Sequence, residues 1–304
     1  MMDPLISVLM STYNETNKEL DESITSILNQ TYSNLEFIII NDNPDSRELE
    51  EKLKLYTDSR IKIFCNDKNL GLVNSLNKGL SLCSGQYVVR MDADDISQLS
   101  RIEDELMYLQ KNCLDMVGSY IETIDENSQT IKKLMKFPEK NNQIIKFMRW
   151  GSCMCHPTWL VKREIFSKLQ GYRRAPHCED YDFILRAISY GYRVGNIPKV
   201  ELKYRIRQSG VSKTNEAEQF LLRDYLAKNM KQIDSLTEAC ITEFLESKEF
   251  DKQLKQLSYY KDAKKMIKNG KCIEKVKAAI TISRSPFFWR DIVEKTTLLA
   301  REHV

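Results

Sequence analysis

The sequence predicts an α/β protein with a mostly parallel sheet that carries helices on both faces, plus a C-terminal helical extension. In the first half of the chain, short apolar runs alternate with amphipathic stretches of helical spacing, which is typical of parallel sheets. From about residue 215, apolar residues recur only at helical spacing between charged flanks. We therefore predict a sheet domain over 1–214, with halves of about 1–115 and 116–214, and a basic helical region over 215–304.

Apolar runs predict the elements in order. The strands of the first half occupy residues 5–10, 35–40, 61–64 and 87–91, and helices lie near 18–29, 46–56 and 72–83. Ser100 followed by Glu103 predicts a capping box for a helix that runs to about Lys111. The second half continues with strands near 116–136, a helix near 139–148 and a helix that begins at Glu179.

Composition is that of an ordinary globular protein. Of the 304 residues, 42% are hydrophobic and 29% are charged, and no apolar run approaches membrane-spanning length. The eight cysteines form no CxxC pair and no signal sequence precedes the first strand, so we expect reduced thiols in a cytoplasmic protein. From Lys261 onward, eleven basic residues accompany five acidic ones. This tail, with the aromatic residues at 286–289, predicts either peripheral contact with an anionic membrane or a solvated face over a buried aromatic cluster.

Three carboxylates follow the fourth predicted strand: Asp92, Asp94 and Asp95. Like charges this close repel one another unless a cation lies among them, and hard divalent ions prefer oxygen ligands. The cluster therefore predicts a metal site, and a loop of solvated acids is the alternative.

Polar side chains also follow the other predicted strands, at the sheet edge where open α/β sheets bind ligands. Thr12 and Tyr13 offer a hydroxyl and an aromatic face to a flat base, and Asp42 offers an acceptor for an imide N–H. Each of them also fits an ordinary turn or helix cap. No GxGxxG or GxxxxGKS/T element follows a strand, so neither a dinucleotide-binding fingerprint nor a P-loop is predicted.

Motifs in these positions resemble those of the family 2 inverting glycosyltransferases with the GT-A fold, whose sheet is Rossmann-like. They are ISVLMSTYN at 6–14, IIND at 39–42, NLGL at 69–72 with NKG at 77–79, and MDADD at 91–95. Their order and spacing match as well, and the resemblance extends over about residues 4–214.

The resemblance implies a role for each site. Asp94, with Asp92, would hold Mn²⁺ or Mg²⁺, and Asp180 beside Glu179 would be the catalytic base, although first-turn acids that stabilise a helix dipole are the alternative for this pair. A nucleotide-sugar donor would contact a larger set: Thr12, Tyr13, Asn14, Glu15, Asp42, Asn69, Gly71, Asn74, Arg90, Asp92, Ala93 and Asp94.

One stretch departs from the family pattern. Many relatives carry a His near position 207 that assists the metal or the diphosphate, whereas this chain has Arg207 there. Arg207 or Arg205 would pair with the diphosphate instead, because guanidinium groups match phosphate geometry. Basic residues on a strand edge are the alternative. We expect His156 to be a structural or acceptor-side residue and not a metal ligand.

The implied activity is metal-assisted transfer of a single hexose, with inversion, from a UDP-sugar to a glycan or lipid-linked acceptor. Such a reaction needs a base on the acceptor and neutralisation of the departing diphosphate, hence two carboxylate sites. The alternatives are a catalytically silent nucleotide-sugar-binding protein and a sugar nucleotidyltransferase, but residues 11–15 lack the glycines of the latter. The resemblance suggests a bacterial surface-polysaccharide pathway, with no nucleic-acid partner.

Overall fold

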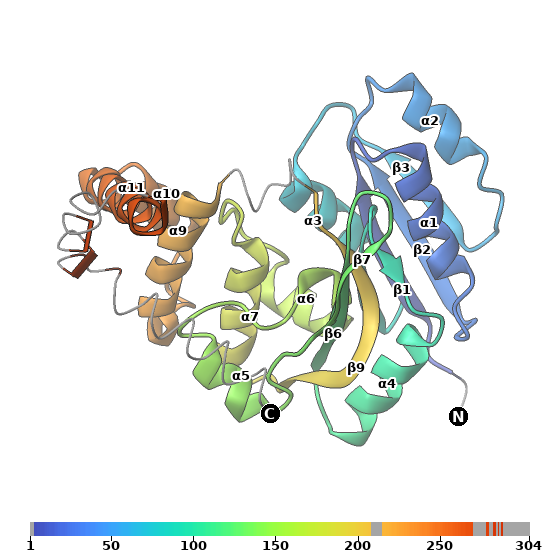
Figure 1. Cartoon of the computed structure of the whole chain (residues 1–304). Helices are drawn as coiled ribbons and strands as arrows, with labels where there is room; N and C mark the ends of the chain where they lie inside the picture. Colours follow the sequence, from blue (N-terminus) through green and yellow to red (C-terminus); the bar gives the residue numbers. More distant parts are fainter. Residues whose placement is uncertain are drawn as a thin grey trace.

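The computed structural model describes residues 3–207 and 215–269, together with residues 278, 279, 282, 283, 285 and 287. Within these residues a nine-stranded sheet has the order β3-β2-β1-β4-β8-β6-β9-β5, with β7 paired to β6 (Figure 1). The strands are β1 (Ile6–Thr12), β2 (Leu35–Asn41), β3 (Ile61–Cys65), β4 (Tyr87–Asp92), β5 (Ile96–Ser97), β6 (Met116–Ile124), β7 (Thr130–Met135), β8 (Leu160–Lys162) and β9 (Val194–Arg205).

The first half of the sheet is parallel, and this aligns the strand ends that carry polar residues. β1 lies between β2 and β4, with Thr12 opposite Asn41 and Ser11 opposite Asp92. β8 then pairs antiparallel with both β4 and β6, and β9 runs parallel to β6. The carboxyl ends of β1, β2 and β4 therefore meet at one edge of the sheet.

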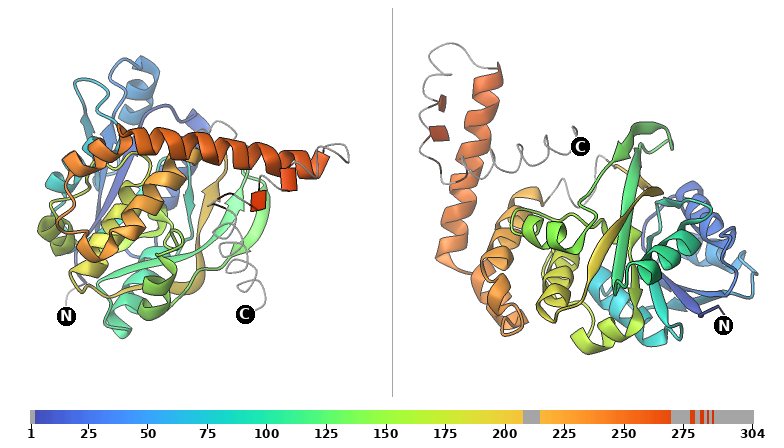
Figure 2. Two further views of the ribbon diagram at one scale, coloured as in Figure 1. Left: turned by 90° about the vertical axis from the view of Figure 1, so that its left-hand side faces the viewer. Right: turned by 90° about the horizontal axis from the view of Figure 1, so that it is seen from below.

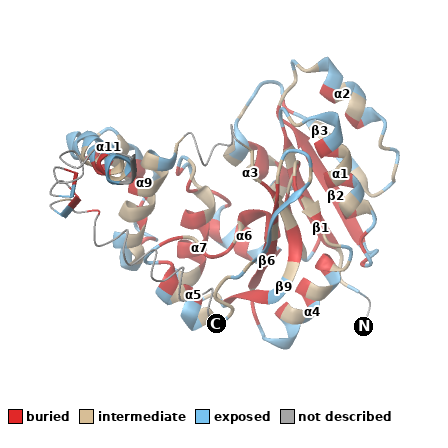
Figure 3. Cartoon of the chain, viewed as in Figure 1, coloured by how far each residue is buried: buried red, intermediate tan, exposed pale blue. Residues whose placement is uncertain are grey.

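Helices cover both faces of the sheet, as predicted (Figures 1 and 3). Side chains alternate along each strand, so Met10 packs with one group of helices and its neighbour Leu9 with the other. The first group comprises α1 (Asn17–Leu28), α2 (Arg47–Lys54) and α4 (Arg101–Lys111). The second comprises α3 (Leu72–Leu82), α5 (Asn141–Phe147), α6 (Arg163–Leu169) and α7 (Glu179–Ser189).

The C-terminal helices are α9 (Glu216–Lys228), α10 (Glu238–Leu245) and α11 (Lys248–Asn269), with the short 3₁₀ helix η2 (Met230–Gln232) between α9 and α10. They lie beside α5–α7, and α11 projects past the sheet domain (Figure 2). Leu222, Leu226 and Ile241 are completely buried in the same core as Trp159 and Tyr181. α9 and α10 therefore share a hydrophobic core with the sheet domain.

The predicted strands and helices of the first half are confirmed to within about two residues. The predicted capping box is wrong: Ser100 is the N-cap of α4, but its side chain makes no cap hydrogen bond and instead accepts one from Lys199 Nζ at 3.0 Å. A capping box is present at the start of α1, where Thr16 and Glu19 bond reciprocally. The prediction missed β5, β8 and α6, and it marked only the end of β9, as a strand edge near Arg205 and Arg207.

The predicted aromatic tail lies mostly outside the described residues. Of positions 286–289 only Phe287 is described, and it is buried against Phe220 and Tyr260. Across the described part of the chain, no helix has the length and apolar character required to cross a membrane. The seven described cysteines are all free thiols.

Candidate active site

Three carboxylates gather where β4 ends. One oxygen each from Asp92, Asp94 and Asp95, called here the acid trio, lies within 4.8 Å of the others. Asp95 is buried; its Oδ1 accepts a hydrogen bond from the Arg205 amide at 2.7 Å, and its buried Oδ2 has no donor among the described residues. Three converging oxygens, one of them without a donor, fit the ligand set of a hard divalent cation.

Crowding and burial disfavour negative charge on the trio. Burial, followed by the charge of Asp92, raises the pKa of Asp94 to about 7, although Arg207 opposes the shift. Burial and the charges of Asp94 and Asp92 raise the pKa of Asp95 well above its ordinary value. A cation among them would relieve this repulsion.

Two arginines partly neutralise the trio. Arg90 is buried in β4 and its Nη1 forms an ion pair with Asp92 Oδ1. Arg207 follows β9, and its Nε lies 3.0 Å from Asp94 Oδ2 while its Nη2 donates to Glu19 Oε2 at 3.0 Å. In the stretch that departs from the family pattern, Arg207 thus lies directly on the predicted metal ligand.

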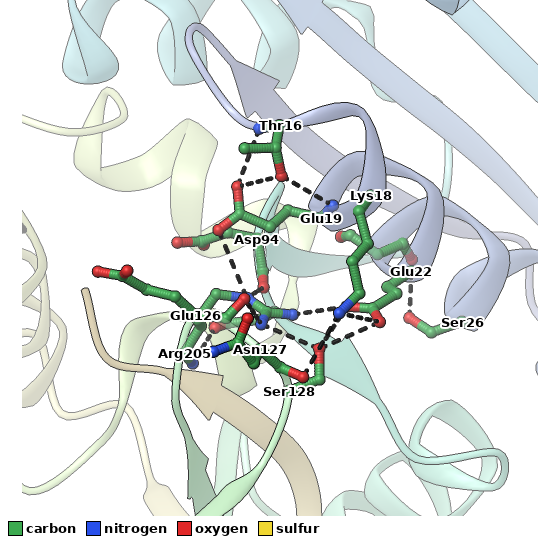
Figure 4. A network of polar contacts seen from close by, with 12 residues as sticks. Thr16, Lys18, Glu19, Glu22, Ser26, Asp94, Glu126, Asn127, Ser128 and Arg205 are labelled. Atoms are coloured by element: carbon green, nitrogen blue, oxygen red, sulfur yellow. Dashed lines mark hydrogen bonds and ion pairs between the residues drawn. The ribbon is translucent and has the colours of Figure 1, made fainter.

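Arg205 is buried among polar partners from three segments of the chain. Its guanidinium is fully buried and donates to the Asp94 carbonyl at 2.7 Å, to Glu22 Oε2 at 2.7 Å and to Ser128 Oγ at 3.1 Å (Figure 4). These donors are committed to joining α1, the loop of the acid trio and the turn between β6 and β7. These contacts favour the structural alternative for Arg205 over the expected contact with a diphosphate.

The turn after β1 is closed by Glu15. Its Oε2 accepts hydrogen bonds from Thr12 Oγ1 at 2.6 Å and from the Tyr13 amide at 2.8 Å, while Asn14 is exposed. The Tyr13 side chain is 44% exposed. The turn interpretation therefore holds for Thr12 and Glu15, and the Tyr13 ring remains open to a stacking partner.

Asp42 organises the loop before α3. It is 3% exposed, and its carboxylate accepts hydrogen bonds from Asn66 Nδ2 and from the amides of Leu70 and Gly71, at 2.7 to 2.9 Å. Gly71 has a φ of 77°, which suits glycine. Two more of the residues predicted to contact the nucleotide-sugar bond to this loop: Asn69 Oδ1 accepts from the Gly71 amide, and Asn74 Nδ2, in the first turn of α3, donates to the Leu70 carbonyl.

Ala93 lies between the first two acids of the trio. Its side chain is buried in the core that contains α1, α2 and α4, so only its backbone remains to meet a ligand.

The second acid pair begins α7. Burial and the charge of Asp180 raise the pKa of Glu179 to about 7, and burial raises the pKa of Asp180 too. The positive charge of Arg90 opposes both shifts, and the Tyr181 amide, which donates to Asp180 Oδ1 at 2.7 Å, opposes the shift of Asp180. Arg90 is therefore the cation that the acid trio and this pair share.

An aromatic cluster of His156, Trp159 and Tyr172 lies close enough to the second pair for the charges of Asp180 and Glu179 to act on the Tyr172 hydroxyl. His156 is buried, its Nε2 lies 2.8 Å from the Tyr172 hydroxyl, and its ring packs against Trp159. Burial and the charge of Arg90 hold the pKa of His156 well below its ordinary value, so the ring is neutral. Asn77 joins the two halves, because its side chain bonds both the amide and the carbonyl of Tyr172 at 2.8 Å.

Sequence reasoning missed two contributors to the site. Glu19 and Glu22 of α1 reach Arg207 and Arg205, but nothing in an ordinary amphipathic helix marks them in advance. Arg90 was predicted to contact the nucleotide-sugar, and not to lie between the two acid clusters. The sequence carries a signal for that position, because Arg90 interrupts an otherwise apolar buried strand.

Comparisons with known proteins agree on one family. A family model described as Glycosyl transferase family 2 matches residues 7–170. The chain is 37% identical over 233 residues to the O-antigen biosynthesis glycosyltransferase WbnJ of Escherichia coli, covering 74% of this chain and 90% of that protein. It is 31% identical over 205 residues to an E. coli UDP-Gal:alpha-D-GlcNAc-diphosphoundecaprenol beta-1,3-galactosyltransferase, covering 66% and 74%.

Solved structures agree on the fold. The S. aureus TarS fragment 1–349 in complex with UDP-GlcNAc superposes with a TM-score of 0.57 at 14% identity, covering 85% of this chain and 80% of the fragment. Against the longer TarS crystal structure, the TM-score is 0.57 at 16% identity, and the match covers 79% of this chain and 43% of that one.

Proposed function

This chain belongs to glycosyl transferase family 2, and from that premise we propose that it moves one sugar, with inversion, from a UDP-sugar to a hydroxyl of a glycan or lipid-linked acceptor. The observation that carries the proposal is that two clusters of carboxylates share one buried cation, Arg90. The acid trio ends β4, the pair Glu179–Asp180 begins α7, and Arg90 acts on both. Inverting transfer needs one site for the leaving diphosphate and another for a proton.

In the proposed reaction Asp180 is the base. It takes the proton from the acceptor hydroxyl as that oxygen bonds to the anomeric carbon, while the bond from that carbon to the UDP oxygen breaks on the opposite side. A raised pKa suits this role, because the carboxylate then holds a proton more strongly near neutral pH. Glu179 and Arg90 set the charge around it.

At the donor side, Asp94 with Asp92 and Asp95 would hold Mn²⁺ or Mg²⁺. Such an ion, when bound, supplies positive charge that stabilises the leaving diphosphate. Arg207, which contacts Asp94, adds a second cation for the same oxygens. The exposed Tyr13 ring would stack on the uracil. The imide N–H of the uracil would donate to Asp42 Oδ2, which accepts one hydrogen bond among the described residues.

Two similarities support the nature of the substrates. The galactosyltransferase relative is named for a UDP-sugar donor and a diphosphoundecaprenol-linked acceptor, and TarS has been solved with UDP-GlcNAc. A lipid-linked acceptor would bring the protein to the inner face of the cell membrane, with residues 1–115 serving the donor and 116–214 the acceptor.

Calorimetry with UDP, with and without Mn²⁺, tests the proposal, followed by turnover of a panel of UDP- and GDP-sugars. We expect UDP binding that Mn²⁺ strengthens, and loss of that dependence in Asp94→Asn. Asp251→Asn, which removes an exposed carboxylate in the first turn of α11, is the matched control.

The alternatives give different results. Metal-dependent binding with no turnover of any sugar would indicate a silent nucleotide-sugar-binding protein. Turnover of a nucleoside triphosphate with a sugar phosphate would indicate a nucleotidyltransferase. An equal affinity for UDP with and without Mn²⁺ would contradict the proposed metal site.

A further inference from the structure

The loop that leads into α7 has a strained residue next to the acid pair. His177 has a φ of 62°, in the left-handed region that non-glycine residues rarely adopt. It lies two residues before Glu179, so its conformation sets the direction in which the chain enters the helix. Strained backbone persists only where the surrounding structure holds it, and it is frequent at functional sites.

The helix does not fix its own beginning. Cys178 is the N-cap of α7, and its side chain makes no capping hydrogen bond. A polar N-cap side chain would normally orient the first turn. Another part of the chain must therefore hold the turn that contains Glu179 and Asp180.

α9 holds this turn through Gln219. The side-chain Nε2 of Gln219 donates to the His177 carbonyl at 2.7 Å, and the Gln219 carbonyl accepts from Cys178 Sγ at 3.4 Å. One turn further along α9, Leu222 is buried in the same core as Cys178 and Tyr181. Arg223, on the same helix, is near enough for its charge to lower the pKa of Asp180.

We propose that Gln219 is a positioning residue for sugar transfer: its amide keeps His177 in the left-handed conformation and so sets where Glu179 and Asp180 lie. α9, beyond the residues that the family model matches, thereby acts in catalysis. The inference rests on the proposed function, in which Asp180 is the base. Small displacements of a reacting group cost large factors in rate, because the group leaves its attack geometry.

Gln219→Met tests the inference, since it keeps the length of the side chain and removes the donor. We expect kcat to fall about tenfold or more, while the KM for the donor, the Kd for UDP and the melting temperature stay near wild type. Gln253→Met on α11, where the amide donates to the exposed Glu249 and to no other side chain among the described residues, is the matched control and should change nothing.

His177→Gly adds a rescue, because glycine adopts the left-handed region without strain. The double variant His177→Gly with Gln219→Met should recover most of the lost kcat. Wild-type kcat in Gln219→Met, parallel losses of kcat and UDP binding, or no recovery in the double variant would each overturn the inference. Asp180→Asn separates the two proposals: full activity there would refute the assigned base, whatever Gln219→Met does.

Discussion

At the scale of single residues, Asp180 carries the sharpest expectation. Asp180→Asn keeps the shape of the side chain and removes its ability to accept a proton. Transfer should fall by roughly 10² to 10⁴-fold, the usual contribution of a general base. The Kd for UDP should stay within about twofold, because the donor nucleotide is expected at the other acid group. Steady-state kinetics measures the rate of transfer and calorimetry measures the Kd for UDP. Retained transfer would show that another group takes the proton.

The pH profile follows from the same pair. Burial and the charge of Asp180 raise the pKa of Glu179 to about 7, and burial raises the pKa of Asp180. The base must be deprotonated, so kcat should begin to fall in acid at a higher pH than an aspartate with the ordinary pKa of 3.8 would cause. A profile of kcat from pH 4 to 9 tests this, and a flat profile down to pH 4 would contradict it.

Arg207 gives a prediction about metal affinity. Its guanidinium contacts Asp94, so its positive charge opposes a cation at the acid trio. Arg207→Gln should therefore bind Mn²⁺ several-fold more tightly in the absence of nucleotide, as measured by the fraction of free Mn²⁺ in electron paramagnetic resonance. Arg47→Gln, on the exposed face of α2, is the control for loss of one charge. Weaker Mn²⁺ binding in Arg207→Gln would mean that this arginine supports the site.

Residue types and their order were enough to predict the acid trio and the pair at α7. The contacts of the arginines were not predictable in the same way. Arg205 and Arg207 are two residues apart on one stretch, yet one is buried among main-chain carbonyls and the other lies on Asp94. The difference arises from α1, which lies about 180 residues earlier in the chain and supplies Glu19 and Glu22.

At the scale of elements, the strands with continuous apolar runs were predictable because burial on both faces demands such runs. β8 was not, because it has three residues, and β5 has two. Short strands owe their conformation to their neighbours: Val88 and Val89 of β4 determine where β8 pairs. The strand order around β8 therefore could not be derived from local pattern.

Glu36 of β2 joins several elements and gives a stability prediction. Its carboxylate accepts from Ser7 Oγ at 2.6 Å, from the Ser84 amide at 2.6 Å and from Lys62 Nζ at 2.7 Å. Burial alone would raise the pKa of Glu36, but these donors outweigh it and lower the pKa from 4.5 to about 2. Because the pKa is lower in the folded state, the stabilisation is present above pH 4.5 and is lost as pH falls toward 2.

Glu36→Gln should therefore lower the free energy of unfolding by about 3 kcal/mol at neutral pH. The difference from wild type should shrink in acid, because the Glu36 carboxylate of the unfolded chain takes up a proton below pH 4.5, whereas that of the folded chain does so only near pH 2. Urea unfolding at pH 7 and pH 3 measures both values, and Glu51→Gln on exposed α2 should have little effect. An equal loss at both pH values would contradict the linkage.

At the scale of the whole molecule, the C-terminal helices α9 and α10 are part of the same folding unit as the sheet domain. Five side chains of residues 216–245 are buried in the core that contains α6 and α7: Leu222 and Leu226 of α9, Ile233 and Leu236 of the connection between η2 and α10, and Ile241 of α10. At roughly 2 kcal/mol for each buried side chain, their loss is comparable with the entire stability of a domain. Helical spacing predicted a helical region here, and we placed a domain boundary before it at residue 215. The spacing alone does not reveal what a helix packs against.

Truncation tests this shared core. A chain that ends at Thr214 should be insoluble or unfolded, whereas one that ends at Glu246 retains all five side chains and should fold and bind UDP. Circular dichroism and UDP calorimetry compare the two. A stably folded, UDP-binding protein that ends at Thr214 would show that the helices are dispensable for folding.

The two hydrogen bonds between Asn77 and Tyr172 restrict which chimeras of this enzyme with a relative would fold. Asn77 lies in the predicted half 1–115 and Tyr172 in the predicted half 116–214, and a Cβ on the adjoining Gly171 would lie 2.3 Å from Asn77 Oδ1. A chimera that exchanged one of these halves with that of a relative would therefore need a matching amide and glycine where the halves meet.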